Sequence, residues 1–423
     1  MVPFIQMTRR SRTKRLDKCR LCTSSELDIF LDLGFAPPSD LLISKDNYDQ
    51  PQEMFPLQVQ QCRKCGLTQT VYAVDPSIMY GKNYLYEASI TRTGVSHFHR
   101  MAESIQKTFR FPAGALAVDI GSNVGVLLEG FQKQGFRVLG IDPAPNICGI
   151  ANRKGIETWQ DFMSSEVAAR IARKKSRAFV VTATNVFGHI HDKQNLLAAL
   201  DILLEKRGIF VIEVPYLVDL IANLEYDTIY HEHLEYLSVK PIHQFFSRNG
   251  FEIVNWERNS IHGNSIRIFL ARKNMVKGRA SVSRILELEE KARIYEPDRL
   301  KKFAADVRES AKSFRELLVE IRNNGKKCIG ISAPAKGNTI LNYCKIDTSL
   351  ISCMIEKSKL KRGFFTPGMK IPILGEEGMA RQQADFGVIF AWNFAKEIMN
   401  NSAEFRKAGG RFILPIPKPR ILG

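Results

Sequence analysis

Four consecutive residues, Tyr230-His231-Glu232-His233, place two imidazoles, a carboxyl and a phenol in one short segment. Histidine is the side chain best suited to move a proton near neutral pH, and a neighbouring carboxylate can orient the ring and stabilise the imidazolium. Such a group fits the removal of a proton from a carbon next to a ketone, where the enolate oxygen must also be stabilised. The segment is therefore a candidate catalytic site for the chemistry of carbon acids.

Two other interpretations of this segment remain open. Zinc proteases carry H-E-x-x-H, with histidines one helical turn apart, whereas His231 and His233 are two residues apart and would point to different faces of a helix. A polar surface turn would carry the same residue types. The spacing disfavours a metal site but does not exclude the surface turn.

A glycine turn further upstream has the form of a cofactor-binding loop. The apolar run 115–121 leads into it and a helical pattern follows, so helix amide groups would point at a ligand. The next apolar run ends in Asp142, about 20 residues on, where an acid can bind both hydroxyls of a ribose. The predicted cofactor contacts are Asp119, Gly121, Ser122, Asn123, Gly125, Asp142, Pro143 and Asn185.

The glycine spacing favours S-adenosylmethionine. Gly121 and Gly125 form G-x-x-x-G rather than the G-x-G-x-x-G of dinucleotide sites, and S-adenosylmethionine has no pyrophosphate to hold. An ordinary strand-to-helix turn is the alternative. Asn185 ends another apolar run, where methyltransferases face the sulfonium methyl, and its alternative role is to cap the next helix.

Two cysteine pairs near the N-terminus have the spacing of a zinc site. Cys19 and Cys22 form one C-x-x-C turn, and Cys62 and Cys65 form another. Zinc binds four thiolates tetrahedrally, and each such turn presents two of them. The gap of roughly 40 residues is longer than in zinc ribbons, but an inserted loop is tolerated. We expect structural zinc, with buried thiols or a redox pair as the alternative.

The elements that must position these groups alternate between apolar runs and helical stretches, a pattern typical of parallel α/β sheets. The charged helical segment 280–323 is expected to face solvent and to join two lobes. The expected strands are 115–121, 137–142, 177–186, 207–215, 350–358 and 386–393, with 251–259 and 265–273 as an antiparallel pair. The predicted units are a disordered basic arm (1–18), a zinc-binding domain (19–78), a methyltransferase domain (79–283) and a C-terminal α/β domain (284–423).

The chain of 423 residues carries a formal net charge of +17. This balance favours anionic partners, whether nucleic acid, an acidic membrane surface or a phosphate-bearing small molecule, although spread charge also serves solubility. No run approaches the roughly 20 apolar residues that span a bilayer. The first residues are apolar and the bases follow, the reverse of a secretory signal, so we expect a cytoplasmic protein.

Together these motifs resemble the sugar C-methyltransferase family of deoxysugar biosynthesis. The resemblance covers nearly the whole chain, and its most specific stretches are VDIGSNVGVLLEGF, GIDPAPN, IYHEHLEYLS, SAPAKGNTILNYC, FFTPGMKIPI and AWNFAKEI. It implies a Rossmann-like class I methyltransferase domain between a small zinc domain and a C-terminal Rossmann-like α/β domain. It also implies S-adenosylmethionine and structural zinc as cofactors. The implied substrate is a nucleotide diphosphate 4-keto-6-deoxy sugar, methylated next to its ketone through an enolate.

The resemblance implies roles for individual residues. His233 would remove the proton, Glu232 and Tyr230 would support it, and Tyr84 or Tyr86 would face it. The last two share a face if their segment is extended, and the pattern does not choose between them; aromatic packing is the alternative for each. The predicted substrate contacts are His189, His231, Lys336, Asn338, Thr339 and Asn342.

The C-terminal loop 332–339 follows an expected strand, so its backbone amides, Lys336 and Thr339 could hold a diphosphate. A tight turn between strand and helix is the alternative. The segment His262-Gly263-Asn264-Ser265 departs from the paired glycines usual in the family, and this departure leaves the identity of the substrate open.

Two other classes of function remain. A nucleic-acid methyltransferase would explain the zinc module and the basic arm, but the chain lacks the interleaved aromatic and basic residues on which single strands stack. A non-catalytic scaffold with a cofactor fold is disfavoured by the presence of Asp142 and His233. We therefore expect neither nucleic acid nor a membrane as a partner.

Overall fold

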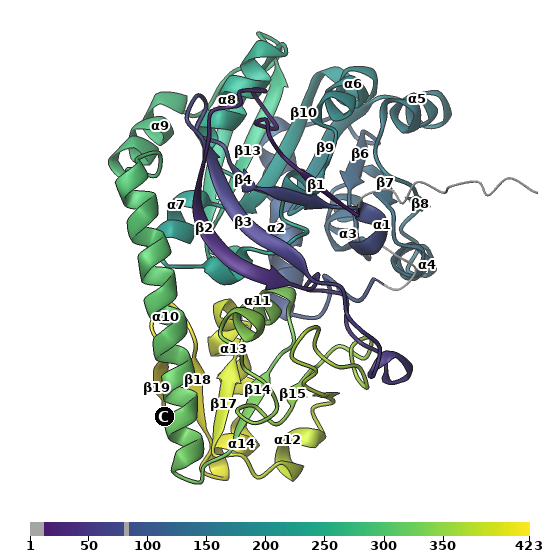
Figure 1. The fold of residues 1–423 in the computed structure, drawn as a ribbon. Helices are drawn as coiled ribbons and strands as arrows, with labels where there is room; N and C mark the ends of the chain where they lie inside the picture. Colours follow the sequence, from purple (N-terminus) through teal and green to yellow (C-terminus); the bar gives the residue numbers. More distant parts are fainter. Residues whose placement is uncertain (1–11, 80–83) are drawn as a thin grey trace, which may run out of the picture.

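The computed structural model describes residues 12–79 and 84–423. Within them the strands form sheets of seven, six, four and two strands. Figure 1 shows the seven-stranded sheet and its helices in teal above, the six-stranded sheet in yellow and green below, and the purple strands of the N-terminal part between them. The helix α10 (Pro297–Asn323) runs along one side of the molecule past these parts.

The seven-stranded sheet has the order β12-β13-β10-β9-β6-β7-β8. Its strands β6 to β10 are parallel, and β13 pairs antiparallel with β10 and β12. The chain adds β7 and β8 on one side of β6 and β9 and β10 on the other, so the carboxyl ends of β6 and β9 flank the point where open α/β sheets bind ligands. The strands are β6 (Leu116–Ile120), β7 (Arg137–Asp142), β8 (Thr158–Gln160), β9 (Ala178–Thr184), β10 (Leu204–Pro215), β12 (Phe251–Asn259) and β13 (Ser265–Arg272).

Helices cover both faces of this sheet because alternate residues of each buried strand point to opposite sides. Ala117 packs in a cluster with residues of α2 and α3, whereas Val118 packs in a cluster with residues of α5, α6 and α8. The expected antiparallel pair at the end of the sheet is confirmed. The helices are α2 (Arg92–Phe109), α3 (Val126–Lys133), α4 (Pro145–Arg153), α5 (Ser165–Lys174), α6 (Lys193–Leu203), α7 (Leu217–Ala222) and α8 (Val239–Arg248).

The four-stranded sheet joins two distant parts of the chain. Its order is β11-β4-β3-β2, and β11 (Glu235–Tyr236) follows the Tyr230-His231-Glu232-His233 segment directly. Glu235 pairs with Gln69 in antiparallel register. The N-terminal elements are β2 (Leu27–Ala36), β3 (Phe55–Cys62), β4 (Thr68–Thr70), β5 (Tyr72–Val74) and α1 (Pro76–Met79).

The predicted disordered arm is corrected at its C-terminal end. Residues Thr13–Arg15 form β1, which pairs antiparallel with β5. The amide of Leu16 donates to the Val71 carbonyl at 2.8 Å, and Gln60 Nε2 donates to the Leu16 carbonyl at 2.9 Å. Backbone pairing needs no apolar side chains, so a basic segment can still form an edge strand. Residues 1–11 lie outside the described part of the chain.

The C-terminal part has a six-stranded sheet of order β16-β15-β14-β17-β18-β19, parallel except at β19. The expected strand 350–358 is reduced to β15 (Met354–Ile355). The other strands are β14 (Cys328–Ile331), β16 (Ile373–Leu374), β17 (Phe386–Ile389), β18 (Arg411–Leu414) and β19 (Arg420–Leu422). The helices are α11 (Ala335–Tyr343), α12 (Gly378–Arg381), α13 (Ala395–Asn401) and α14 (Ala403–Lys407).

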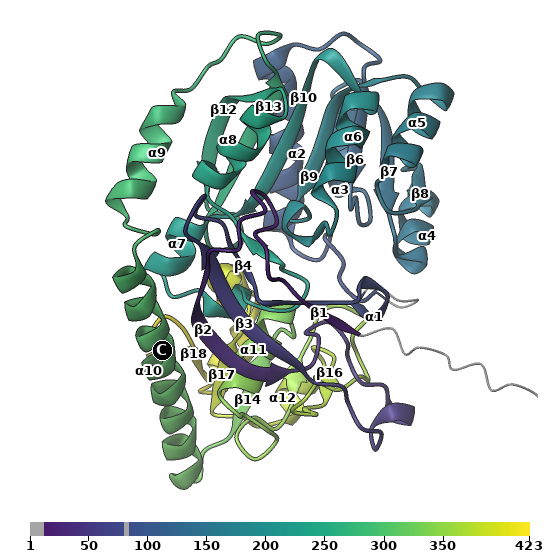
Figure 2. The same cartoon turned by 45° about the horizontal axis from the view of Figure 1, so that its top comes forward.

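The charged helices α9 (Val282–Lys291) and α10 are not purely solvent-facing, which corrects the prediction. Residues Leu300, Phe303, Val307 and Phe314 of α10 recur at helical spacing and are buried. Phe303 contacts Phe30 of β2 with ring centroids 6.5 Å apart. The helix therefore packs along several units, and Figures 1 and 2 show it beside both the N-terminal strands and the yellow C-terminal sheet.

Among the described residues, no helix combines the length and the apolar character that crossing a membrane requires.

Candidate functional site

The four predicted zinc ligands come together. The Sγ atoms of Cys19, Cys22, Cys62 and Cys65 all lie within 4.8 Å of one another. The Cys19–Cys65 and Cys22–Cys62 pairs are each 3.5 Å apart. Three of the four side chains are buried, and Cys22 is half-buried. This is the donor set of a closed, structural zinc site with no position left for a substrate.

The glycine loop lies at the carboxyl end of β6, and its two predicted glycines are sterically required. Gly121 has φ +67°, and a Cβ there would approach Val186 Cγ2 to 2.4 Å. Gly125 has φ +82°, and a Cβ there would approach Ile156 Cγ2 to 2.7 Å. Both positions therefore exclude a side chain, because each glycine has a positive φ and packs against a neighbouring side chain.

Asp142 ends the neighbouring strand β7 and is fixed by two backbone amides. Its Oδ2 accepts from the amide of Asn123 at 2.9 Å, and its Oδ1 accepts from the amide of Ala144 at 2.9 Å. Burial raises the pKa of Asp142, and the two amide bonds oppose that shift. Each oxygen retains a second lone pair, so the carboxylate can still accept from hydroxyl groups. Pro143 is half-buried in the turn that leads to α4.

Asp119 faces the neighbouring strand rather than open space. Its Oδ1 accepts a hydrogen bond from Thr182 Oγ1 of β9 at 2.6 Å, and burial raises its pKa to about 7. By contrast, Ser122 Oγ and Asn185 Oδ1 are buried and have no hydrogen-bond partner in the part of the chain that the structure describes. These two unsatisfied polar atoms follow β6 and β9, respectively, as expected where a polar ligand completes a site.

The segment with the two candidate tyrosines lies over the glycine loop. Asn123 Nδ2 donates to the Tyr86 carbonyl at 3.0 Å, and the amide of Ala88 donates to Asn123 Oδ1 at 2.9 Å. Asn146 of α4 holds the backbone of Tyr84 in the same manner, at 3.3 and 2.8 Å. Asn123, predicted as a cofactor contact, thus also anchors the segment that covers the loop.

The structure separates Tyr84 from Tyr86. Tyr84 packs against the apolar cluster that contains residues of α2 and α3. Tyr86 is partly exposed as a residue, and burial of its phenol group, followed by the charge of Asp40, raises its pKa to about 12. The charge of an ionised Tyr86 also contributes to raising the pKa of Tyr230. Of the two, Tyr86 is therefore the one that neighbours the Tyr230-His231-Glu232-His233 segment.

His233 is oriented by the backbone. Its Nδ1 lies 2.7 Å from the carbonyl oxygen of Thr228, which can only accept, so Nδ1 carries the proton and Nε2 keeps a lone pair. The ring lies 3.9 Å from the Tyr230 ring and 4.9 Å from the His189 ring, measured between centroids. Asn185, His189, Thr228 and His233 line one pocket, together with Glu235.

His189 lies at the end of the short helix η2 (Phe187–His189). Burial lowers its pKa well below the usual value, and the nearby His233 lowers it further. The ring is therefore neutral at pH 7 and can donate or accept a hydrogen bond inside the pocket. Of the predicted substrate contacts, His189 is the one that shares the pocket with His233.

Glu232 and Tyr230 lie in a buried group of acids and phenols. Both carboxyl oxygens of Glu232 are buried and lack a hydrogen-bond partner among the described residues. Burial, and then the charge of Asp40, raises the pKa of Glu232 to about 8. Burial, Asp40 and Glu232 also raise the pKa of Tyr230 well above its usual value. Asp40 comes from the loop after β2, and nothing in the sequence pattern around it signals this contact.

His231 is not brought to the pocket. It is 1% exposed, its Nε2 lies 3.3 Å from the carbonyl oxygen of Phe55, and its ring contacts the Phe55 ring. Burial lowers its pKa to about 4, so the ring is neutral. The segment forms a turn in which the amide of His233 donates to the Tyr230 carbonyl at 3.0 Å, and within it the His231 ring is directed to Phe55. The structure gives it a packing role against β3.

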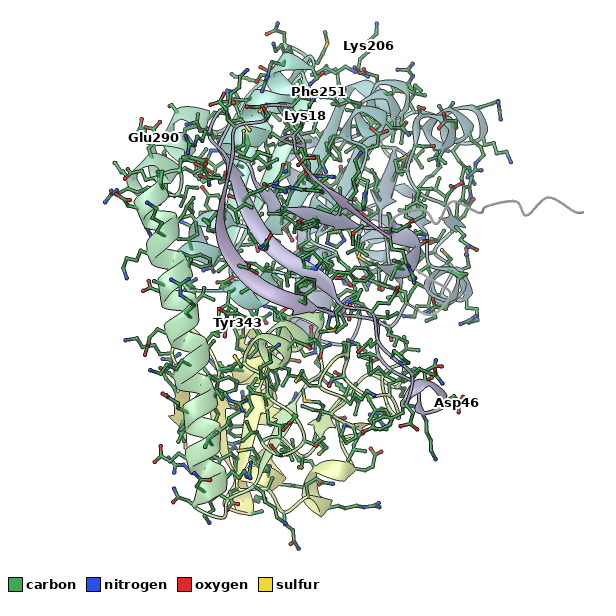
Figure 3. All side chains as sticks on the ribbon, in the orientation of Figure 1. Lys18, Asp46, Lys206, Phe251, Glu290 and Tyr343 are labelled. Atoms are coloured by element: carbon green, nitrogen blue, oxygen red, sulfur yellow. The ribbon has the colours of Figure 1, made fainter. Side chains whose placement is uncertain are left out.

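The four polar residues predicted at the C-terminal loop also contact protein atoms. Lys336 Nζ lies 3.8 Å from Asp227 Oδ2 and 4.5 Å from the ring centroid of Trp392, and it is buried. Asn342 Nδ2 donates to the Pro367 carbonyl at 3.0 Å. Lys336 Nζ has no hydrogen-bond partner among the described residues, so its contact with a diphosphate stays a prediction. Figure 3 shows Tyr343, the last residue of α11, close to α10 near the middle of the molecule.

Asn338 and Thr339 connect α11 to the loops of the candidate site. Asn338 Nδ2 donates to the Ser39 carbonyl at 2.6 Å, directly before Asp40. Thr339 Oγ1 donates to the Ile229 carbonyl at 2.9 Å, directly before Tyr230. Both side chains are buried. They hold the backbone beside two functional segments instead of facing a ligand.

Comparison with known proteins identifies the family. Residues 19–80 match a model for a zinc binding domain, residues 95–255 a methyltransferase domain, and residues 260–417 a C-methyltransferase C-terminal domain. The C-methyltransferase NovU of Streptomyces niveus is 34% identical over 408 residues, which cover 96% of this chain and 97% of NovU. The chain belongs to this C-methyltransferase family. It is a SAM-dependent C-methyltransferase with an N-terminal four-cysteine zinc module and an α/β class I methyltransferase core.

Solved methyltransferase structures resemble part of the C-methyltransferase. A SAM-dependent methyltransferase from Anabaena variabilis is 18% identical, with a TM-score of 0.34, and the match covers 42% of this chain and 86% of that one. The magnesium protoporphyrin IX methyltransferase of Synechocystis, solved with bound SAM, is 15% identical, with a TM-score of 0.32, and the match covers 47% and 89%.

Proposed function

We propose that this C-methyltransferase methylates the carbon next to the ketone of a nucleotide diphosphate 4-keto-6-deoxy sugar, and that His233 removes the proton from that carbon. The observation that carries the proposal is the 2.7 Å contact between His233 Nδ1 and the Thr228 carbonyl oxygen. It makes Nε2 the unprotonated ring nitrogen, the one that can act as a base, in a pocket that Asn185 and His189 also line.

S-adenosylmethionine supplies an electrophilic methyl group when bound. The glycine loop, Asp142 and the unsatisfied atoms Ser122 Oγ and Asn185 Oδ1 would hold it at the carboxyl ends of β6, β7 and β9. His233 Nε2 would take the proton from the substrate carbon, and the enolate carbon left behind would be the nucleophile for the methyl group that S-adenosylmethionine would supply. The proton stays on the imidazole until it passes to solvent.

The enolate oxygen needs hydrogen-bond donors that are already in place. His189 is neutral and lies beside His233, so one of its ring nitrogens can donate. Tyr86 and Tyr230 keep their phenol protons because burial and nearby acids raise their pKa values. We assign the facing tyrosine role to Tyr86, since Tyr84 packs in an apolar cluster.

The choice of a nucleotide-linked keto-sugar rests on the family resemblance of the motifs and on the excess of basic charge, +17, which favours a phosphate-bearing substrate. We further propose the division into units at 19–78, 79–283 and 284–423, with the nucleotide bound by the last. A cytoplasmic location remains a prediction.

Two measurements test the proposal. The first incubates the enzyme with methyl-labelled S-adenosylmethionine and a panel of nucleotide 4-keto-6-deoxy sugars, and label should appear on the sugar carbon. The second follows solvent deuterium exchange at that carbon without S-adenosylmethionine, which isolates proton removal. Exchange that persists unchanged in His233→Gln would refute the assigned base.

A further inference from the structure

The two zinc knuckles have the same local sequence but different surroundings. Each is C-R-x-C, with Arg20 between the first pair of cysteines and Arg63 between the second. The Arg63 side chain is 66% exposed and pairs with Asp28 at the surface. The Arg20 side chain is 8% exposed and points into the molecule. The two arginines occupy the same position of the motif, but one is buried and the other is exposed.

Arg20 contacts the methyltransferase part at three atoms. Its Nε donates to Glu235 Oε1 at 2.8 Å, and its Nη2 lies 2.6 Å from the Ile190 carbonyl oxygen and 3.1 Å from that of His191. A planar guanidinium presents its donors in a fixed fork, so these three bonds set the relative position of their acceptors. The acceptors belong to two separate segments of the chain.

Each of these two segments carries one histidine of the pocket. Ile190 directly follows His189, and Glu235 lies two residues after His233. The amide of Leu234 also donates to the Gly188 carbonyl at 3.1 Å, so the segments are adjacent. Arg20 thus holds together the backbone that carries the two rings, whose centroids are 4.9 Å apart.

Buried charges around Arg20 make this contact costly to break. Glu235 is fully buried and also pairs with Lys193 at 3.0 Å, and Lys193 donates to the Ile190 carbonyl at 2.7 Å. Glu235 Oε2 lines the pocket and has no hydrogen-bond partner in the described part of the chain. Removal of the Arg20 guanidinium leaves the buried Glu235 carboxylate paired with Lys193 alone, and this loss of stabilisation favours a rearrangement of β11.

We propose that Arg20 is a positioning residue that couples the zinc knuckle to the His189–His233 pair. The inference rests on the proposed role of His233. The backbone amide of Arg20 donates to Gln69 Oε1 at 3.0 Å, and Gln69 pairs with Glu235 across β4 and β11. The knuckle is therefore anchored to β4, which pairs with β11 after the histidine segment, and a metal bound by the four cysteines would hold the knuckle that carries Arg20.

The test compares Arg20→Met with Arg63→Met, the matched arginine of the other knuckle. Arg20→Met should lower kcat by about 10- to 100-fold, the range found when a supporting residue is lost. Its zinc content and its affinity for S-adenosylmethionine should match those of the unmodified protein. The imidazole NMR signals of His189 and His233, assigned with single His→Gln variants, should shift. Arg63→Met should change none of these, and Arg20→Lys should restore part of kcat.

The possible outcomes separate this inference from the proposed function. Unchanged imidazole signals and unchanged kcat in a folded, zinc-loaded Arg20→Met protein would overturn the positioning role. Shifted signals with full kcat would instead show that Arg20 positions the rings but that His233 is not the base. If Arg20→Met does not fold, Arg20→Lys carries the same test, because it keeps the charge and loses the fork.

Discussion

His233 Nδ1 donates to the Thr228 carbonyl oxygen across 2.7 Å, and this bond determines which ring nitrogen can act as a base. The carbonyl belongs to the residue five positions upstream, Thr228, which ends the short helix η3 (Tyr226–Thr228). Because a carbonyl has no proton to give, the bond selects one tautomer of the neutral ring.

His233→Gln should lower kcat by about 10²- to 10⁴-fold, the usual contribution of a positioned general base. The affinity for S-adenosylmethionine should stay the same, since Asp142 and the glycine loop lie on other elements. Steady-state turnover and titration calorimetry measure the two quantities. His191→Gln, at an exposed position, is the control and should retain activity. An active His233→Gln enzyme would contradict the assignment.

Asp142→Ala should weaken binding of S-adenosylmethionine by about 10- to 100-fold, which corresponds to the loss of a hydrogen bond to a charged group. Two backbone amides hold the Asp142 carboxylate in place at the end of β7. Alanine has no group that could accept the hydrogen bonds of the ribose, so affinity falls. Calorimetry on the purified protein measures it. Asp201→Ala, at an exposed position paired with Arg272, should bind normally.

Glu232→Gln should stabilise the protein more at pH 8 than at pH 5. The pKa of Glu232 is raised to about 8 in the folded state by burial and by Asp40, above its ordinary value of 4.5. A raised carboxyl pKa means that the folded state binds the proton more tightly, so its stability contribution is present below pH 4.5 and is lost as the pH rises towards 8. Glutamine does not titrate and removes this loss.

Thermal unfolding at several pH values measures the effect as a difference in Tm between Glu232→Gln and the unmodified protein. The difference should grow with pH. Glu290→Gln, which changes an exposed side chain of α9 labelled in Figure 3, is the matched control. A difference in Tm that stays constant from pH 5 to pH 8 would mean that Glu232 does not titrate in this range.

Cys62→Ser should reduce the zinc content and the yield of folded protein. The four Sγ atoms lie within 4.8 Å, so loss of one ligand opens the site, and binding of a structural metal is linked to folding. A loss of several kcal/mol corresponds to a fall in Tm of roughly 10 °C. Metal analysis and calorimetry measure both effects. Cys353→Ser, far from the cysteine cluster in sequence, should keep its zinc.

Thr339→Val distinguishes a positioning role from substrate binding. Its Oγ1 holds the Ile229 carbonyl, so the substitution should lower kcat by up to about tenfold, equivalent to one hydrogen bond, and leave KM for the nucleotide sugar unchanged. A rise in KM with constant kcat would instead indicate that Thr339 contacts the diphosphate of the substrate, as the sequence predicts. Thr348→Val, at an exposed position, provides the control.

The motifs that are local in sequence were predicted well. The cysteine turns, the glycine loop and the acid at the end of β7 each depend on a few neighbouring residues, and strands 137–142 and 251–259 were placed with their observed bounds. Local patterns predict strands and turns because the regular spacing of side chains in each element shows directly in the order of apolar and polar residues. The sequence did not reveal the environment of His231, because its ring contacts Phe55, which lies far away along the chain.

The sequence by itself determined the family, the turn of glycines after β6 and the four cysteines of the zinc site, whereas the role of His233 stays a prediction. Only the tertiary structure decided that Tyr86 rather than Tyr84 neighbours the catalytic segment, that Asp40 acts on Glu232, and that Arg20 reaches both histidine segments. It also assigned Asn338 and Thr339 to backbone carbonyls instead of a phosphate. These contacts join residues far apart along the chain, and they arise from how the sheets and helices pack, which no local pattern encodes.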